Sequence, residues 1–291
     1  MAQLLMLDDA IEQFLTVGAS FRGYSEGTVS IYRRDLGRFR RFVLGQGISH
    51  PGDVTTTVLT QFLYGLNGGG KGLGPGSIQR TAAAIRALYS FLSDTGAVKQ
   101  NPAASLKLPR SPRPTEPRVL TTEEASRLVD ACQTPEEHAM IDLLLHTGIR
   151  RAELTTIRLG DFDMGAKTLV VHGKGNKDRT ISLHPRALAA INEQLMHRDG
   201  PPCDRLFLSK YGGPMGMGRV RKIVARVARR AGLEGVHPHT LRHTCATLLC
   251  QSGADLRSVQ EIMGHASIAI TERYLHTSLG AMQRAVEKLS I

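Results

Sequence analysis

The first third of the chain repeats apolar residues at helical spacing. Residues 29–43 and 78–92 place an apolar side chain every three or four positions, and residues 4–17 and 55–66 carry weaker patterns of the same kind. Such helices bury the apolar stripe and leave charged residues outside. The pattern predicts four helices and no strand in this part.

Helix ends become recognisable in the rest of the chain. Thr121 with Glu124 and Thr134 with Glu137 have the spacing of capping boxes, in which each side chain bonds the backbone N–H of the other residue. Gly148 is typical of a helix stop. Further helices are predicted at residues 219–231, 238–252, 255–263 and 268–276.

The same region contains short strand-like runs. Residues 168–172 and 179–183 predict two strands, and the glycine-containing residues 173–178 predict the hairpin turn between them. Residues 206–209 are a further candidate strand. The expected fold class is therefore mainly α with a small β-hairpin or sheet, which is confined to a second, α+β domain.

A proline-rich stretch separates the two parts. Residues 108–118 contain four prolines, which exclude a regular helix or a central strand. Such a stretch is typical of an extended, semi-rigid linker. We therefore expect a helical domain over residues 1–107, a linker over residues 108–118 and a second domain over residues 119–291.

The chain is strongly basic. Its 37 Lys and Arg residues outnumber 26 Asp and Glu residues, which gives a net charge of +11. This balance favours a polyanionic partner such as nucleic acid, because positive charge attracts phosphates and releases their counterions. Charge alone fits a basic protein without such a partner equally well. Arginine-rich helices likewise suit phosphate contacts or a solvated face.

Cysteine spacing and hydropathy bear on the compartment. The four cysteines form no CxxC pair, which predicts neither a zinc site nor a disulfide framework and indicates buried thiols in a reducing cytoplasm. The sequence has no signal-peptide pattern and no apolar run approaching the ~20 residues of a membrane span. We expect a cytoplasmic protein without membrane contact.

Two segments place basic residues where they could act on a phosphate. Arg150 follows the helix stop at Gly148, and the carboxylate of Glu153 three residues later can hold it. Lys174 lies on a glycine-flanked hairpin tip, from which a mobile side chain can reach a partner. An ordinary polar turn is the alternative, and neither segment specifies a function alone.

Two later segments add histidines and a tyrosine. His239 and Arg242 share a face on the first turn of a helix, where backbone N–H groups and the helix dipole favour an anion. A metal site is disfavoured there, because the nearby i,i+4 histidine pair lacks the glutamate of a zinc-protease helix. His265 follows a glycine, and Tyr274 lies nine residues later. Taken alone, this tyrosine fits a half-buried structural position.

The four segments, in this order, resemble the tyrosine recombinase family, particularly its Xer-type and phage-integrase members, over residues 119–276. The resemblance implies a helical core-binding domain followed by a catalytic domain. It implies a site-specific recombinase that cuts and rejoins double-stranded DNA through a 3′-phosphotyrosyl link and a Holliday junction, for integration, excision or dimer resolution. The 107 residues before the linker leave no room for an arm-binding domain, which favours the Xer-like type.

The resemblance also assigns roles. The implied catalytic residues are Arg150, Lys174, His239, Arg242, His265 and Tyr274, with Glu153 in support. The arginines would bind the non-bridging oxygens of the scissile phosphate, and the histidines would complete the pocket, His239 also assisting proton removal. The lysine would be the general acid and the tyrosine the nucleophile. Two permanently charged guanidiniums can neutralise the developing charge as metal ions do elsewhere, so we expect no metal and no other cofactor.

The partners implied are DNA and further recombinase subunits. The residues expected to bind DNA are Arg33, Arg34, Arg38, Arg41, Arg80, Arg86, Arg219, Arg221 and Lys222. An apolar stripe of helical period follows the tyrosine, at Leu279, Met282, Val286 and Leu289. It would dock as an exchange helix into a neighbouring protomer, or else fold back on its own domain. We expect a homotetramer on two recombination sites or a heterotetramer with a second recombinase.

Two positions depart from the family pattern: Met263 stands where leucine is usual and Cys245 where an aromatic residue is frequent. Both fit packing variants. Three alternatives remain at this stage, namely a non-catalytic DNA-binding protein of the same fold, a type IB topoisomerase-like relaxing enzyme, and a metal nuclease. The missing carboxylate cluster disfavours the nuclease. Dimer resolution, phage integration and transposition fit the sequence equally.

Overall fold

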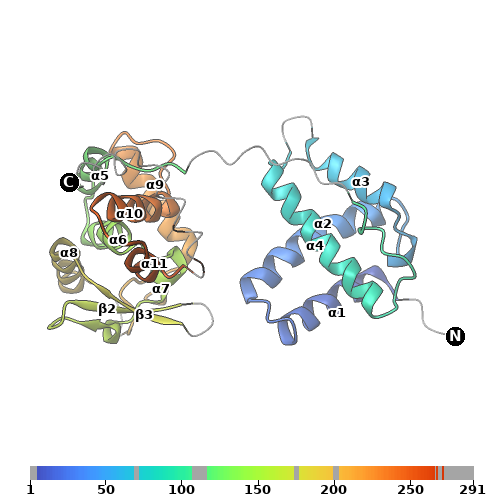
Figure 1. The fold of residues 1–291 in the computed structure, drawn as a ribbon, viewed down its shortest axis with the longest axis horizontal. Helices are drawn as coiled ribbons and strands as arrows, with labels where there is room; N and C mark the ends of the chain where they lie inside the picture. Colours follow the sequence, from blue (N-terminus) through green and yellow to red (C-terminus); the bar gives the residue numbers. More distant parts are fainter. Residues whose placement is uncertain are drawn as a thin grey trace, which may run out of the picture. The chain divides into compact units, whose positions relative to one another are not determined.

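The chain forms two compact units, Met1–Thr115 and Glu116–Ile291 (Figure 1). The structure, a computed structural model, describes residues 5–68, 72–106, 117–173, 177–198, 203–265, 267 and 271. Each unit has its own hydrophobic core. Within these described residues, no helix combines the length and apolarity that crossing a bilayer requires.

The N-terminal unit is a bundle of four helices around an aromatic core. Phe14, Phe39 and Tyr89 are fully buried, and the ring centroids of Phe39 and Phe62 lie 5.4 Å apart. The four predicted helices are confirmed, although the first begins later than expected. They are α1 (Leu7–Ser20), α2 (Glu26–Leu44), α3 (Thr56–Gly65) and α4 (Pro75–Asp94), with the 3₁₀ helix η1 (Pro51–Asp53) before α3.

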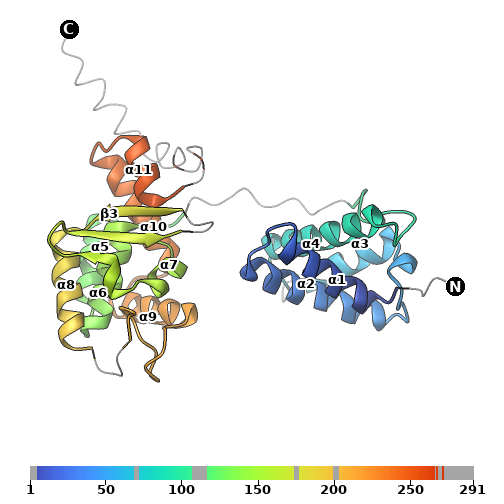
Figure 2. The same cartoon turned by 90° about the horizontal axis from the view of Figure 1, so that it is seen from below.

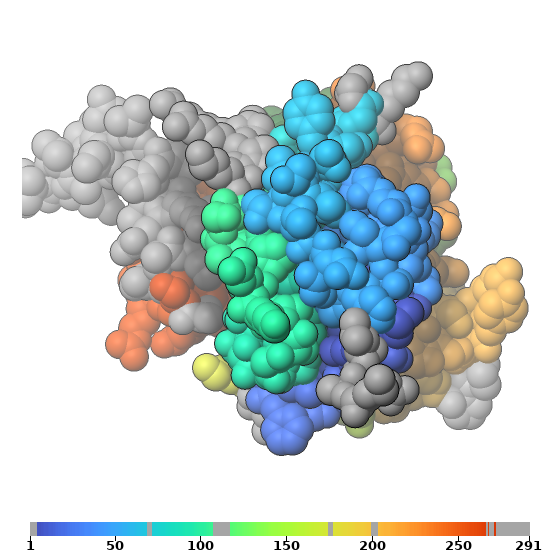
Figure 3. Space-filling view, turned by 90° about the vertical axis from the view of Figure 1, so that its right-hand side faces the viewer, coloured from blue at the N-terminus to red at the C-terminus, as the bar shows by residue number. Residues whose placement is uncertain are grey.

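Side-chain hydrogen bonds fix the ends and connections of this bundle. Ser25 caps α2, and Thr55 caps α3, by accepting from backbone N–H groups of the first turn. The chain after α4 returns to α3, because Thr56 donates from its hydroxyl to the Pro102 carbonyl at 2.8 Å. In Figure 3 the cyan and green segments of the N-terminal unit lie next to each other.

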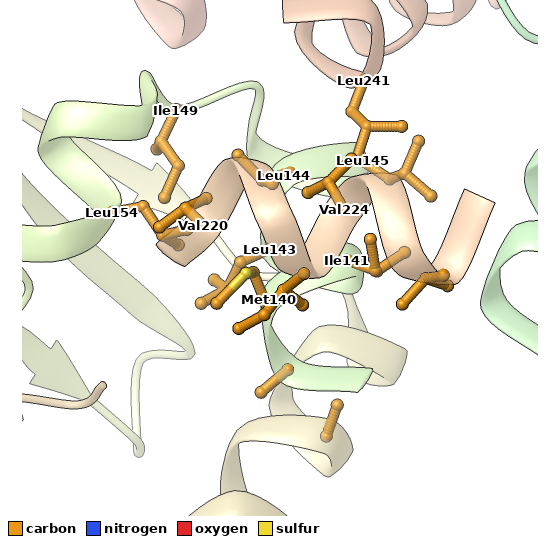
Figure 4. Packing of buried hydrophobic residues seen from close by; sticks show 14 of the residues in the cluster. Met140, Ile141, Leu143, Leu144, Leu145, Ile149, Leu154, Val220, Val224 and Leu241 are labelled. Carbon is orange, nitrogen blue, oxygen red and sulfur yellow. The ribbon is translucent and has the colours of Figure 1, made fainter. Parts of the chain in front are cut away.

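The C-terminal unit is built around one buried helix, α6. Every residue from 139 to 145 in it is buried, as expected for a helix that other elements surround. Its Leu144 and Met140 pack among Val220, Val224 and Leu241 from two later helices (Figure 4). The helices of this unit are α5 (Thr122–Asp130), α6 (Pro135–Thr147), α7 (Arg151–Thr156), α8 (Pro185–Met196), α9 (Met217–Arg230), α10 (Pro238–Gln251) and α11 (Leu256–Met263).

A small antiparallel sheet completes the unit, so the expected mainly helical fold with a small sheet is confirmed. Its strand order is β1 (Phe162–Asp163), β2 (Thr168–His172) and β3 (Asp178–Ser182), after the 3₁₀ helix η3 (Leu159–Asp161). Leu169 pairs with Ile181, and Val171 pairs with Arg179. Leu169, Val171 and Ile181 are buried. Helix α11 lies beside β3 (Figures 1 and 2).

Two local predictions are wrong. Residues 206–209 form no strand: Leu208 makes only an isolated bridge with Pro214, because the chain turns back at once and Ser209 N–H bonds the Gly213 carbonyl. Thr134 accepts from the Glu137 N–H as predicted, but the Glu137 carboxylate does not return to Thr134. It bonds the Gln133 N–H instead. The Thr121–Glu124 box is reciprocal, as predicted.

Candidate active site

The site begins where α6 ends and α7 starts. Gly148 ends α6 in the left-handed region, with φ of 58°, and a Cβ at this position would lie 2.5 Å from the Met263 sulfur. The turn and the close packing therefore both require glycine. Arg150 follows this turn and is the residue that directly precedes α7.

A buried glutamate holds Arg150 in place, which confirms the predicted contact. Glu153 accepts from the Arg150 backbone N–H at 2.7 Å and from Arg150 Nη1 at 2.8 Å. Arg179 of β3 donates to the same two carboxylate oxygens at 2.8 and 3.1 Å. Burial alone would raise the pKa of Glu153, but the hydrogen bonds from Arg179 and Arg150 lower it below its ordinary value. The carboxylate is therefore charged at neutral pH.

Arg242 reaches the same region from α10. Its side chain is buried, and its two terminal nitrogens donate to the main-chain carbonyls of Gly148 and Met263, the latter at 2.6 Å. These bonds connect α10 with the end of α6 and the end of α11. A buried guanidinium needs such partners, because its desolvation is otherwise costly.

Three successive carbonyls at the C-terminal end of α11 each accept from a different arginine. The pairs are Arg179 Nε to Ile262 at 2.9 Å, Arg242 Nη2 to Met263 at 2.6 Å and Arg150 Nη2 to Gly264 at 2.6 Å. Carbonyls at a helix C-terminus lack intrahelical partners and carry the negative end of the helix dipole. The last turn of α11 therefore brings together the two arginines predicted to bind phosphate.

His265 directly follows this turn. Its backbone N–H donates to the Gln260 carbonyl at 3.1 Å, and its Nδ1 lies 2.9 Å from the Thr271 hydroxyl. Burial, together with the positive charges of Arg242 and Arg150, lowers the pKa of His265 to about 4. The ring is therefore neutral at physiological pH and has one donor and one acceptor nitrogen.

His239 stands on the first turn of α10. The neighbouring His237 caps the helix through its Nδ1, which accepts from the Thr240 N–H at 3.1 Å, while His239 is exposed. The imidazole is nevertheless partly shielded from water, and this partial burial, with the charges of His237 and nearby arginines, lowers the pKa of His239. Its neutral form, which can accept a proton, is therefore favoured near pH 7.

Several predicted features lie outside the described residues. Lys174 belongs to the connection between β2 and β3, of which Gly173 and Lys177 are described. Tyr274, most of the helix predicted at residues 268–276 and the apolar stripe that follows it are also outside. Their assignments stay predictions.

Arg179 is a site residue that the sequence analysis missed. It lies two residues before buried Ile181 on β3 and therefore on the same face of the strand. A charged side chain at a buried strand position needs a charged or hydrogen-bonding partner. This position in the alternation was the signal, and Glu153 is the partner.

Three of the six arginines of the N-terminal unit that are predicted to bind DNA share a buried carboxylate. Arg34, Arg38 and Arg80 all form ion pairs with Asp35, which is fully buried in α2. Three guanidiniums and one carboxylate leave two positive charges on this cluster. Arg33 instead pairs with Glu12 and is half exposed. The remaining two bond main-chain carbonyls: Arg41 that of Gly37 and Arg86 that of Leu106.

The basic helix α9 divides its charges between two uses. Arg226 and Arg230 bind the buried carboxylate of Glu137 at the start of α6, and Arg219 binds Glu136. These pairs attach α9 to α6. Arg221 and Lys222 are exposed and form no ion pair with another described residue. Among the described residues, no three His, Cys, Asp or Glu side chains gather as metal ligands would.

Comparison with known proteins covers both units. The model of the Phage integrase family matches residues 118–279, and that of the Phage integrase, N-terminal SAM-like domain matches residues 11–96. The chain is 34% identical to tyrosine recombinase XerC of Oceanobacillus iheyensis, over 99% of this chain and 97% of the relative.

Two solved structures share the fold. One is the XerH site-specific recombinase bound to palindromic difH substrate in a post-cleavage complex, with 23% identity, a TM-score of 0.72, and 97% of this chain and 85% of that chain covered. The other is a lambda integrase tetramer bound to a Holliday junction, with 20% identity, a TM-score of 0.74, and coverage of 94% and 78%.

Proposed function

Because the chain belongs to the phage integrase family of tyrosine recombinases, we propose that Tyr274 is the nucleophile with which it cuts DNA. The protein is a site-specific recombinase, an enzyme that breaks and rejoins DNA strands. This assignment is favoured over a topoisomerase-like relaxing enzyme and over a non-catalytic DNA-binding protein of the same fold.

One observation carries the proposed mechanism: Arg150 and Arg242 converge on the last turn of α11, next to His265. The Tyr274 hydroxyl attacks the scissile phosphorus, and His239 accepts its proton. The P–O5′ bond then breaks, and Lys174 gives a proton to the leaving oxygen. Rejoining reverses these steps, so the phosphodiester bond energy is kept in the 3′-phosphotyrosyl link.

The charges of the site suit this reaction. A phosphodiester is already anionic, and attack by a phenolate adds a second negative charge that the guanidiniums neutralise. Arg150 uses two of its five side-chain N–H groups in hydrogen bonds to other described residues, so donors remain for a phosphate oxygen. The residues supply this charge themselves, so the mechanism requires no cofactor.

The experiment is covalent trapping on nicked duplexes. The binding site is first selected from random duplexes with the Tyr274→Phe protein, which we expect to bind normally. Wild type should form an SDS-resistant adduct in excess chelator, and Tyr274→Phe should form none. Tyr211→Phe is the matched control, because Tyr211 is highly exposed. An adduct with Tyr274→Phe would refute the nucleophile assignment.

We propose that each unit contributes residues that contact DNA. In the N-terminal unit these are Arg34, Arg38 and Arg80 around Asp35, with Arg33, Arg41 and Arg86 of α2 and α4. In the C-terminal unit they are Arg219, Arg221 and Lys222 of α9. Four protomers would assemble on two recombination sites, either of this chain alone or with a second recombinase. The free cysteines fit a reducing compartment, and we place the reaction in the cytoplasm.

The apolar stripe at residues 279–289 would join the protomers of this tetramer. Truncation after Ser278 should leave a folded protein that binds one site but neither synapses two sites nor recombines them. Native gels and sedimentation with two-site DNA measure this. Synaptic tetramers and wild-type recombination after truncation would instead show that the stripe packs within its own protomer.

A further inference from the structure

Arg179 connects three parts of the candidate site. Its guanidinium binds both oxygens of Glu153, and its Nε donates to the Ile262 carbonyl. Only 12% of its side chain is exposed. Arg179 therefore links β3, which follows the hairpin turn containing Lys174 in the sequence, to two other parts of the site. These are Glu153, which holds Arg150, and the last turn of α11.

The packing around Gly264 strengthens this connection. Gly264 has φ of 61°, and a Cβ there would lie 2.9–3.1 Å from three guanidinium atoms of Arg179. The Gly264 carbonyl accepts from Arg150, and the next residue is His265. A shift of the Arg179 guanidinium would therefore displace Gly264, and with it the contact to Arg150 and the position of His265.

Charge gives Arg179 a second effect. Arg150 and Arg179 contribute two positive charges, and Glu153 contributes one negative charge. The three groups together keep one net positive charge beside the proposed phosphate position. Without Arg179, the Glu153 carboxylate would cancel the charge of Arg150.

We propose that Arg179 is a positioning residue for strand cleavage. It fixes Glu153 and the end of α11, and it keeps the charge of Arg150 available to the phosphate. This inference rests on the proposed function, because it requires Arg150 to act on the scissile phosphate.

Two substrates distinguish positioning from a purely structural role. One is the ordinary phosphodiester. In the other, a methyl group replaces one non-bridging oxygen of the scissile phosphate, which removes its negative charge. Loss of folding or of general alignment slows cleavage of both. Loss of charge neutralisation slows mainly the anionic substrate.

The test compares single-turnover cleavage by Arg179→Met and wild type on both substrates. For the phosphodiester we expect a loss of about 10- to 100-fold, the range found when residues that orient the ligands of a metal ion are mutated. For the methylphosphonate, the fold reduction of the cleavage rate should be less than a third of that for the phosphodiester. DNA affinity should stay near wild type. Arg257→Gln, which changes an exposed arginine of α11, should leave both rates unchanged.

Further variants keep the outcome decisive. Glu153→Gln added to Arg179→Met removes the uncompensated carboxylate and should recover part of the lost phosphodiester rate. If Arg179→Met does not fold, Arg179→Gln, which also removes the charge but stays polar, should cleave the phosphodiester more slowly and the methylphosphonate nearly normally. Equal losses on both substrates, or no loss, would overturn the role of Arg179. A wild-type rate for Arg150→Ala would instead overturn the proposed function.

Discussion

Arg242 donates a 2.6 Å hydrogen bond to the main-chain carbonyl of Met263, 21 residues later in the chain. Arg150 donates a hydrogen bond to the next main-chain carbonyl of the same turn, that of Gly264. Arg150, which precedes α7, and Arg242 of α10 therefore take their positions from one short stretch of backbone. Changes to that stretch should affect both, even where no catalytic side chain is altered.

Substitution of Gly264 by alanine tests this dependence. Its positive φ costs an alanine about 1–2 kcal/mol, and the added Cβ would meet the Arg179 guanidinium. We expect lower thermal stability and cleavage reduced by up to about 100-fold, as misplaced catalytic groups can cause. Gly253→Ala is the control, because Gly253 also has positive φ but no atom within 4 Å of the added Cβ. Similar cleavage rates in the two variants would contradict the prediction.

The lowered pKa of His265 predicts a pH dependence of stability. Its pKa is about 4 in the folded protein and 6.5 ordinarily, so between these values the unfolded chain binds the proton first. The free energy of unfolding should therefore decrease as the pH falls from 6.5 to 4, and be unaffected by this group above 6.5.

Urea unfolding between pH 4 and 7.5 measures the effect. His239 and His243 also have lowered pKa values and act in the same direction. The free energy of unfolding should therefore still depend on pH after one histidine is replaced. His265→Asn should show a smaller loss of stability on acidification. Identical pH profiles for wild type and variant would show that His265 is not the group responsible.

The proposed general acid can be tested by changing the leaving atom. Lys174→Ala should slow cleavage of a normal phosphodiester by about 100-fold or more, within the range of general acid catalysis. A substrate with sulfur at the bridging 5′ position should be cleaved almost normally, because a thiolate leaves without protonation. Lys177→Ala on the same hairpin should affect neither substrate. Equal damage on both substrates would remove Lys174 from this role.

Asp35 offers a prediction in which charge and orientation give opposite signs. Asp35→Asn makes the N-terminal unit more positive, so charge alone predicts tighter DNA binding. We expect weaker binding, because Arg34, Arg38 and Arg80 lose the carboxylate that orients them, together with about 1–3 kcal/mol of stability. Binding is measured by fluorescence anisotropy at fixed salt. Asp9→Asn, at an exposed position of α1, controls for the change in net charge, and tighter binding by Asp35→Asn than by this control would refute the prediction.

The sequence predicted most of the long helices because their burial is one-sided. Helices α2 and α4 have clear apolar stripes, whereas the six residues of α7 are too few to show a period. The false strand at residues 206–209 is apolar because Leu206, Phe207 and Leu208 are buried, although the backbone turns. Burial in an irregular segment gives the same local signal as burial in a strand.

One contact of the candidate site, that of Arg150 with Glu153, was predictable from the sequence, but the other contacts were not. Glu153 lies one helical turn from Arg150, so that pair follows from spacing. Arg179 and the carbonyls of α11 lie far from Arg150 in the sequence. Glu137 does not make its predicted capping bond to Thr134, because Arg226 and Arg230 of α9 bind its carboxylate. Only the tertiary fold specifies such partners.

Recognition of the last α11 turn through its main chain has an evolutionary consequence. Every amino acid presents the same carbonyl oxygen, so mutation at Ile262 or Met263 alters packing without removing the acceptor that an arginine uses. We therefore expect this turn to tolerate changes of side chain while its acceptors for Arg150, Arg179 and Arg242 persist. Protein engineers could therefore diversify the exposed side chains of α11, such as Arg257, and still retain the main-chain acceptors that hold Arg150 and Arg242.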